Sequence, residues 1–181
     1  MKKSTKKEIY SWMKSIALAF IIAFICRQFL FTPTTVFGES MSPTFHEHDR
    51  IVVSKTTKIE RFDVIVFNAP DANKHYIKRV IGLPGDRIKV QDDILYVNGK
   101  EIKEPYLIEN KKGSPLNKIT WDFTLKEITG KSNVPKGVYF VMGDNRLYSK
   151  DSRSFGFVSA ESVIGEVKFR FYPLEKIGNP K

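Results

Sequence analysis

The 181-residue sequence predicts a mainly β protein, with a β-sandwich or barrel-like domain that carries a small inserted lobe and follows one N-terminal transmembrane helix. Three observations predict this fold. An apolar stretch lies near the N-terminus, short β-branched runs recur between glycine and proline turn signals, and a polar segment interrupts those runs. We expect the β core at residues 32–103 and 136–176, and the inserted lobe at residues 104–135.

The N-terminus has the pattern of a membrane anchor. The first 14 residues hold five lysines and one glutamate, a net charge of +4, and we interpret residues 1–11 as a basic cytoplasmic tail. Residues 12–31 are the predicted anchor. Their uninterrupted apolar core, residues 16–26, is short for a span of about 20 residues, but Lys14 and Arg27 can reach the headgroups on either side. Because the basic cluster precedes the anchor, we expect the domain that follows on the extracytoplasmic face of the cell membrane.

A cleavable secretory signal is the alternative interpretation of this segment, since it shares the basic start and the short apolar core. Cleavage of such a signal follows small residues at alternate positions. The residues that follow the apolar core here, 27–33, are mostly bulky and include a charge. We therefore favour an uncleaved, single-pass anchor.

Short strands account for most of the remaining chain. The runs assigned to strands are residues 50–54, 63–68, 76–83, 87–91, 94–97, 100–102, 137–142 and 162–172. Asn98 and Gly99 suit a type I′ turn, so they predict a hairpin between two of these runs. Residues 159–164 favour only a short helical turn. In the inserted lobe we expect one or two strands around residues 119–125 and an exposed loop at residues 111–115.

The composition limits the partners. The net charge of +10 and the pI near 9.6 suit an anionic lipid surface, and we expect membrane lipid as a partner. Nucleic acid is not expected, because no motif offers a defined docking element. The single cysteine, Cys26, permits no intrachain disulfide and is interpreted as a small apolar packing residue.

Three polar clusters contain groups that can carry out chemistry. Residues 38–44 contain Ser40, residues 75–86 place Lys78 in an apolar run, and residues 143–156 combine aspartate, asparagine, arginine and serine. A serine hydroxyl is a weak nucleophile until a base removes its proton, and a lysine with a lowered pKa can be that base. Each cluster alone has a simpler interpretation: a polar loop, a lysine facing solvent, and a loop joined by Asp–Arg pairs.

Together, in this order behind an anchor, the clusters resemble those of bacterial type I signal peptidases of the short, Gram-positive form. The matching motifs are Ser-Met-x-Pro-Thr at 40–44, Arg-Phe-Asp-Val-Ile-Val-Phe at 61–67, Tyr-Ile-Lys-Arg…Gly-Leu-Pro-Gly-Asp at 76–86 and Gly-Asp-Asn-Arg…Asp-Ser-Arg…Gly at 143–156. The resemblance extends to about Phe171 and is weakest between residues 104 and 135. It implies a membrane-bound serine endopeptidase that removes signal peptides from exported preproteins after small residues of the Ala-X-Ala type, with no cofactor and no metal.

The resemblance also implies a role for each matched residue. Ser40 matches the nucleophile, Lys78 the general base, and Ser149 a serine that orients the lysine amine. The residues that match supporting positions are Asp144, Asn145, Arg146, Asp151 and Arg153, the last two as a salt-bridged pair. Those that match positions near shallow pockets for small substrate side chains are Val36, Met41, Phe45, Tyr76 and Ile77.

Gly38 departs from part of the family. Some members place a serine two residues before the nucleophile, where its hydroxyl helps to stabilise the oxyanion. With Gly38 in that position, as in the short Gram-positive type, the oxyanion relies on backbone N–H groups, including that of Ser40.

Lysine becomes a base only when its pKa falls from the usual value near 10.4. Desolvation lowers it, and Tyr76, Ile77, Val80 and the bound substrate are expected to bury Lys78. Arg79 is then expected on the opposite face of the strand, because a second buried cation beside the amine is costly. A neutral-to-alkaline optimum for activity follows.

Three other interpretations remain. Self-cleaving repressors also use a Ser/Lys dyad, but they are soluble and carry a DNA-binding module for which residues 1–31 are too short. A membrane-anchored basic binding protein explains the anchor and charge but not the three clusters. A metal site at His46 and His48 lacks a third ligand nearby, and Asp92 with Asp93 fits a turn better than an acid–base pair.

Overall fold

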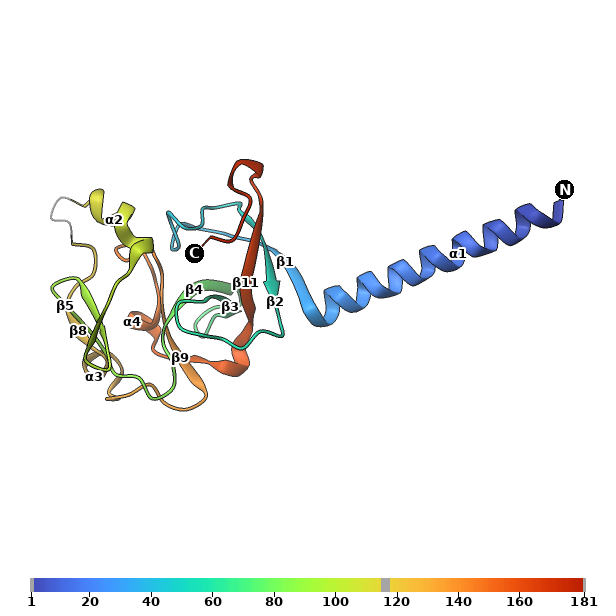
Figure 1. Cartoon of the computed structure of the whole chain (residues 1–181). Coiled ribbons are helices and arrows are strands. Elements are labelled where there is room, and N and C mark those ends of the chain that lie inside the picture. Colours follow the sequence, from blue (N-terminus) through green and yellow to red (C-terminus); the bar gives the residue numbers. More distant parts are fainter. Residues whose placement is uncertain (1, 115–117, 181) are drawn as a thin grey trace.

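The computed structural model describes residues 2–114 and 118–180. It confirms the mainly β fold with one N-terminal apolar helix. In Figure 1 this helix projects from one end of a domain that is built on two antiparallel sheets. Met1 of the expected basic tail and Pro115 of the expected exposed loop lie outside the described residues.

The helix α1 (Lys2–Ile25) continues into a π-helical turn, η1 (Cys26–Leu30). Residues Lys7–Leu30 form a 24-residue segment with a mean hydropathy of 1.9, and none of its most apolar stretch is buried inside the protein. The segment is compatible with a single-pass membrane anchor. It begins earlier than residue 12, and Phe31 already belongs to the first strand.

The larger sheet has seven strands in the order β1-β2-β11-β3-β4-β9-β10. Their bounds are β1 Phe31–Thr35, β2 Arg50–Ser54, β3 Val64–Asn68, β4 His75–Gly82, β9 Val138–Met142, β10 Val158–Ser159 and β11 Val163–Tyr172. The five strands predicted here agree to within one residue at each end. The strands β1 and β10 were not predicted, because Pro33 interrupts the strand pattern of the first and the second has only two residues.

The smaller sheet has four strands in the order β7-β6-β5-β8, with bounds β5 Ile88–Gln91, β6 Ile94–Val97, β7 Lys100–Ile102 and β8 Phe123–Thr124. The predicted hairpin is confirmed, because Asn98 and Gly99 have φ values of 54° and 80° between paired strands. The sequence boundary at residue 104 falls inside this sheet, since residues 88–102 and 123–124 pair with each other.

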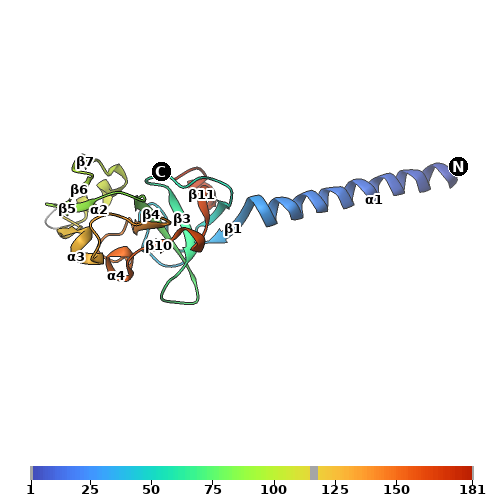
Figure 2. The same ribbon diagram turned by 90° about the horizontal axis from the view of Figure 1, so that it is seen from below.

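One apolar cluster joins the two sheets. It contains Ile81 and Phe140 from the larger sheet and Leu95 and Phe123 from the smaller one. Figures 1 and 2 both place the smaller sheet at the end of the domain opposite α1. The lobe is therefore packed firmly against the core that carries β4 and β9.

Short helices were the main feature missed by sequence. They are α2 Ile108–Lys112, α3 Leu125–Thr129, α4 Ser152–Phe155 and the 3₁₀ turns η2 Pro105–Leu107 and η4 Leu174–Lys176, whereas the short helical turn predicted within residues 159–164 is present as η3 Ala160–Ser162. Part of the expected loop at 111–115 is α2, and the expected strand at 119–125 ends at Thr124. A Thr124–Glu127 capping box starts α3, and this Thr-x-x-Glu signal is visible in the sequence.

Candidate active site

The fold brings Ser40 and Lys78 together. Ser40 lies half-buried in the loop between β1 and β2, and Lys78 lies on β4. The Lys78 Nζ atom is 2.6 Å from Ser40 Oγ, and it donates a second hydrogen bond of 2.9 Å to the Ile77 carbonyl. These distances are short enough for a proton to pass from the Ser40 hydroxyl to a neutral Lys78 amine.

The protein's own residues bury the amine. Lys78 is only 3% exposed and pairs across the strands with Ile65. Burial lowers the pKa of Lys78 to about 8, because desolvation disfavours the ammonium form; the negative charges of Asp151 and Asp144 oppose the shift. A neutral amine is therefore accessible near physiological pH.

Arg79 lies on the opposite face of β4 and is buried as well. Its guanidinium forms a two-point contact with Asp144, with Nε–Oδ1 at 2.9 Å and Nη2–Oδ2 at 2.6 Å. It also donates to the Phe62 carbonyl at 2.9 Å and lies 4.0 Å from the Tyr106 ring centroid. The expectation of a cation kept away from Lys78 holds, but the buried carboxylate that compensates it was not foreseen.

The segment after β9 contacts the loop between β1 and β2, which we call the nucleophile loop after the role expected for Ser40. The Thr44 hydroxyl donates to Asp144 Oδ2 at 2.6 Å, the Asn145 N–H donates to the Ser40 carbonyl at 3.1 Å, and the Asn145 side chain donates to the Glu39 carbonyl at 3.0 Å. The supporting positions Asp144 and Asn145 thus fix the backbone on both sides of Ser40.

Gly143 allows this close approach. A Cβ atom at Gly143 would lie 2.4 Å from the Ser40 carbonyl oxygen and 2.2 Å from Ser149 Oγ, distances that no side chain tolerates. Its N–H donates to Asp151 Oδ2 at 3.0 Å. Sequence reasoning did not single out Gly143 as a site residue, although it opens the Gly-Asp-Asn-Arg motif.

Asp151 and Arg153 form the expected buried ion pair. Arg153 Nε lies 2.8 Å from Oδ1 and Nη2 lies 2.8 Å from Oδ2, while Nη2 also donates to the Arg146 carbonyl. Burial raises the pKa of Asp151, but the Arg153 guanidinium and the Gly143 N–H outweigh it, so the pKa is lowered overall. The carboxylate stays charged and holds Gly143 in place.

Arg146 ties the site to the lobe. Its side chain is buried, donates to the Gly143 carbonyl at 3.1 Å and pairs with Glu104, which also accepts from the Tyr106 hydroxyl at 2.6 Å. Glu104 and Tyr106 were missed, because the sequence between residues 104 and 135 carries the weakest family signal.

Ser149 is beside the site but does not contact the amine. Its Oγ atom is buried and makes no hydrogen bond with any described residue, including Lys78. It lies close enough to the Asp151 carboxylate to help lower the pKa of that group. No hydrogen bond between Ser149 and Lys78 therefore supports the orienting role expected for Ser149.

The residues expected near the pockets lie mainly in the core beneath the site. Val36, Met41, Phe45 and Ile77 are buried in one apolar cluster, while Tyr76 is half-buried and stacks on Phe155. Two cavities, of about 1040 and 440 Å³, contain neither member of the dyad.

The two histidines weighed as metal ligands lie elsewhere in the nucleophile loop. His46 Nδ1 is 3.4 Å from Glu39, and the His48 ring packs edge-on against Phe37. Within residues 2–114 and 118–180, no group of three His, Cys, Asp or Glu side chains gathers as a ligand set.

Comparison with known proteins decides the family. The family model described as "Signal peptidase, peptidase S26" matches residues 9–172. The chain belongs to this family. The identification made from the sequence is thereby confirmed, and this signal peptidase is a serine protease.

Relatives agree over nearly the whole chain. The signal peptidase IB of Staphylococcus aureus strain COL is 48% identical over 179 residues, which cover 94% of this chain and 93% of that protein. The signal peptidase I of Bacillus licheniformis is 43% identical over 184 residues, with 97% and 96% covered. A crystal structure of a signal peptidase I from Enterococcus faecalis V583 is 47% identical, has a TM-score of 0.59, and covers 61% of this chain and 97% of its own.

Proposed function

We propose that this signal peptidase cleaves N-terminal signal peptides from exported preproteins after small residues of the Ala-X-Ala type, with Ser40 as nucleophile and Lys78 as general base. One observation carries the proposal: the 2.6 Å separation of Lys78 Nζ from Ser40 Oγ, with the amine buried. Family membership supplies the reaction class, and the geometry supports the choice of residues.

The first half of the reaction forms an acyl-enzyme. Neutral Lys78 takes the Ser40 Oγ–H proton as Oγ bonds to the scissile carbonyl carbon. The C–N bond then breaks, and the Lys78 ammonium returns its proton to the leaving amine. The signal peptide remains as an ester on Ser40.

The second half releases the signal peptide. Lys78 takes a proton from water, the resulting hydroxide attacks the ester, and Ser40 regains its proton from the ammonium. The oxyanion of each tetrahedral intermediate is assigned to the Ser40 backbone N–H, which makes no hydrogen bond with any described residue. Gly38 has no side chain to contribute a second donor.

We assign Ser149 to positioning the lysine amine during the reaction. Its hydroxyl is buried, lacks a hydrogen-bond partner among the described residues, and lies beside Gly143 and Asp151. A hydroxyl without a partner is free to accept a hydrogen bond from the Lys78 ammonium once the Ser40 proton has moved.

The packed floor under the site favours small substrate side chains. Val36, Met41, Phe45 and Ile77 pack together in one buried apolar cluster, so we expect a substrate pocket over them to be shallow. Tyr76 stacks on Phe155 at one side. This arrangement supports pockets that accept alanine better than larger residues.

The location follows from the anchor. We assign the lysine-rich N-terminus to the cytoplasm and the catalytic domain to the extracytoplasmic face, in contact with membrane lipid. A site held at the membrane meets substrates whose hydrophobic signal helices lie in the same bilayer, which raises their effective concentration.

Cleavage of a precursor by protein in liposomes tests the dyad. Ser40→Ala and Lys78→Ala should each abolish cleavage, whereas Ser42→Ala in the same loop and Lys100→Ala on exposed β7 should retain it. Circular dichroism confirms that each variant is folded. Retained cleavage by Ser40→Ala would refute the nucleophile, and retained cleavage by Lys78→Ala would refute the base.

A further inference from the structure

A cavity of about 1040 Å³ lies on the smaller sheet, at the end of the domain opposite α1 (Figures 1 and 2). We call it the small-sheet groove. Strands β5 and β6 contribute to its lining, together with the start of α3 and residues Ser132 and Asn133. Its volume is at the upper end of the range found for ligand-binding pockets, about 300–1,000 Å³.

Strand register determines which side chains line the groove. Lys89 pairs with Tyr96 on one side and with Thr124 on the other. Directly opposed residues of an antiparallel sheet point to the same face. Because the alternate residues Ile88 and Val90 are buried in the core, this row faces outward.

Three cations line the groove without an ion-pair partner among the described residues. Arg87, Lys89 and Lys126 are exposed, and their side chains form no ion pair or hydrogen bond with any described residue. No carboxylate of a described residue lines the groove. Glu127 lies close enough to influence Lys89, but its carboxylate accepts the Thr124 N–H in the capping box of α3.

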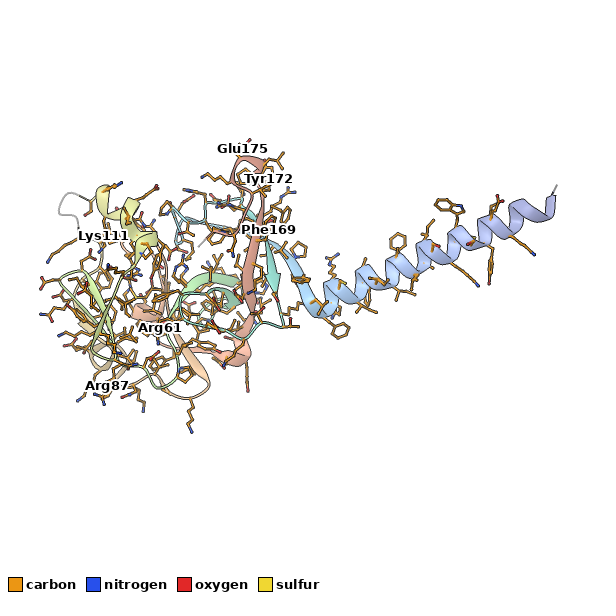
Figure 3. All side chains as sticks on the ribbon, viewed as in Figure 1. Arg61, Arg87, Lys111, Phe169, Tyr172 and Glu175 are labelled. Atoms are coloured by element: carbon orange, nitrogen blue, oxygen red, sulfur yellow. The ribbon has the colours of Figure 1, made fainter. Side chains whose placement is uncertain are left out.

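Two other lysines of the same lobe are paired, in contrast to the three groove cations. Lys111 binds Asp93 at 2.8 Å, and Lys118 binds Asp92 at 2.9 Å. Figure 3 shows Arg87 at the end of the domain remote from α1. Three like charges in one concave surface repel each other and raise the local concentration of anions.

Polar and aromatic groups complete the lining. Tyr96 presents a half-buried ring, and Gln91 and Ser132 offer side chains that make no hydrogen bond with described residues. Asn98 and Asn133 shape the wall instead, since their amides bond to Asp86 and to the Gly85 carbonyl. The free groups suit a ligand that carries hydroxyls as well as negative charge.

We propose that the small-sheet groove binds a polyanion with phosphate groups and hydroxyls, a phosphorylated polyol or glycan chain. Arg87, Lys89 and Lys126 take the phosphates, and Tyr96 packs against the carbon backbone of the chain. The remote position relative to α1 favours a polymer outside the bilayer over the headgroups around the anchor. This function is separate from the dyad and goes beyond peptide cleavage.

Binding is measured on the full chain in nanodiscs of neutral lipid, with a glycerol-phosphate oligomer and inorganic polyphosphate as probes. The groove variant carries Arg87→Gln, Lys89→Gln and Lys126→Gln. The matched control carries Lys58→Gln, Lys112→Gln and Lys136→Gln, which remove the same charge from exposed positions elsewhere. Melting temperature and precursor cleavage should be unchanged in both variants.

The groove variant should bind the oligomer about tenfold or more weakly, with a shallower salt dependence, while the control changes by less than about threefold. Tyr96→Ala should weaken binding of the oligomer but not of polyphosphate. If both triple variants lost the same affinity for the oligomer, the effect would come from net charge alone and the proposal would be overturned. A lack of saturable binding would also overturn it. In a further outcome, the protein binds phosphatidylglycerol vesicles, loses that binding in the groove variant, and fails to bind the oligomer. This result would assign the groove to lipid and overturn the polymer assignment.

Discussion

At the scale of single residues, the proposed site depends on Lys78, because burial of this side chain disfavours its charged ammonium form. Lys78 has a pKa lowered to about 8, and Asp151 and Asp144 limit the shift. The motif predicted Lys78 as the base, but it did not predict the residues that surround the amine. Gly143 and Arg79 act through contacts with Ser40 and Asp144 that come from distant parts of the chain.

The lowered pKa sets the pH dependence. The base must be neutral, so kcat/KM should rise about tenfold per pH unit below pH 8 and level off above it. Lys74 contributes to the lowering, so Lys74→Gln should move the midpoint to higher pH. A pH profile with a fluorogenic peptide measures both; a midpoint that does not respond to Lys74→Gln would contradict this electrostatic account.

Gly143→Ala should damage catalysis more than folding. The new Cβ meets the Ser40 carbonyl at 2.4 Å, so the nucleophile must move, and kcat should fall about 100-fold with a smaller change in KM. Gly113→Ala is the control, since its nearest atom is 3.7 Å away. Steady-state kinetics distinguish the two; a Gly143→Ala enzyme with normal kcat would show that the Ser40 loop adjusts freely.

At the scale of elements, β11 connects the C-terminal turn with the nucleophile loop. Arg170 on β11 donates to the Thr44 carbonyl at 2.8 Å, to Asp49 Oδ2 at 2.9 Å and to the Lys176 carbonyl at 2.8 Å. The same loop therefore has two supports: the segment after β9 on one side and Arg170 on the other. The sequence predicted β11 but not this contact, because Thr44 and Arg170 are 126 positions apart.

Arg170→Ala should loosen the nucleophile loop. It leaves the buried Asp49 carboxylate without its cation, which costs about 1.5–3 kcal/mol of unfolding free energy. We expect a lower melting temperature and a reduced kcat, with partial rescue by Arg170→Lys. Arg50→Ala, an exposed neighbour on β2, is the control for thermal unfolding and kinetics. Unchanged kcat in Arg170→Ala would limit its role to stability.

At the scale of the whole molecule, an exposed apolar helix is joined to a domain with two sheets. The aromatic residues Phe29, Phe31 and Phe37 near this junction are exposed, as a surface beside a membrane allows. At the other end, the small-sheet groove is basic. The two ends therefore suit different surroundings.

The orientation of the anchor can be measured directly. With Cys26→Ser as background, a membrane-impermeant maleimide should label Lys100→Cys on intact cells but not Lys7→Cys. Both should react after permeabilisation, which is the control for access. Labelling of the Lys7→Cys variant alone on intact cells would reverse the topology.

The family, the mainly β class, the N-terminal apolar helix and the hairpin at Asn98–Gly99 could all be predicted from the sequence. These features are encoded locally, in hydrophobic periodicity, turn residues and short motifs that need no knowledge of contacts. The short helices α2, α3 and α4 were not predicted, because four or five residues show too little hydrophobic periodicity to be recognised as a helix.

The charges around the site and the boundary between the two sheets could be seen only in the tertiary structure. Only folding places Lys78 against Ser40, gives Arg79 a carboxylate and brings Glu104 to Arg146. It also assigned residues 88–102 to the smaller sheet, since strand pairing follows from register across the chain and not from composition. The physical reason is common to all of them: burial, pKa and ion pairing depend on neighbours in space, and those neighbours are distant in sequence.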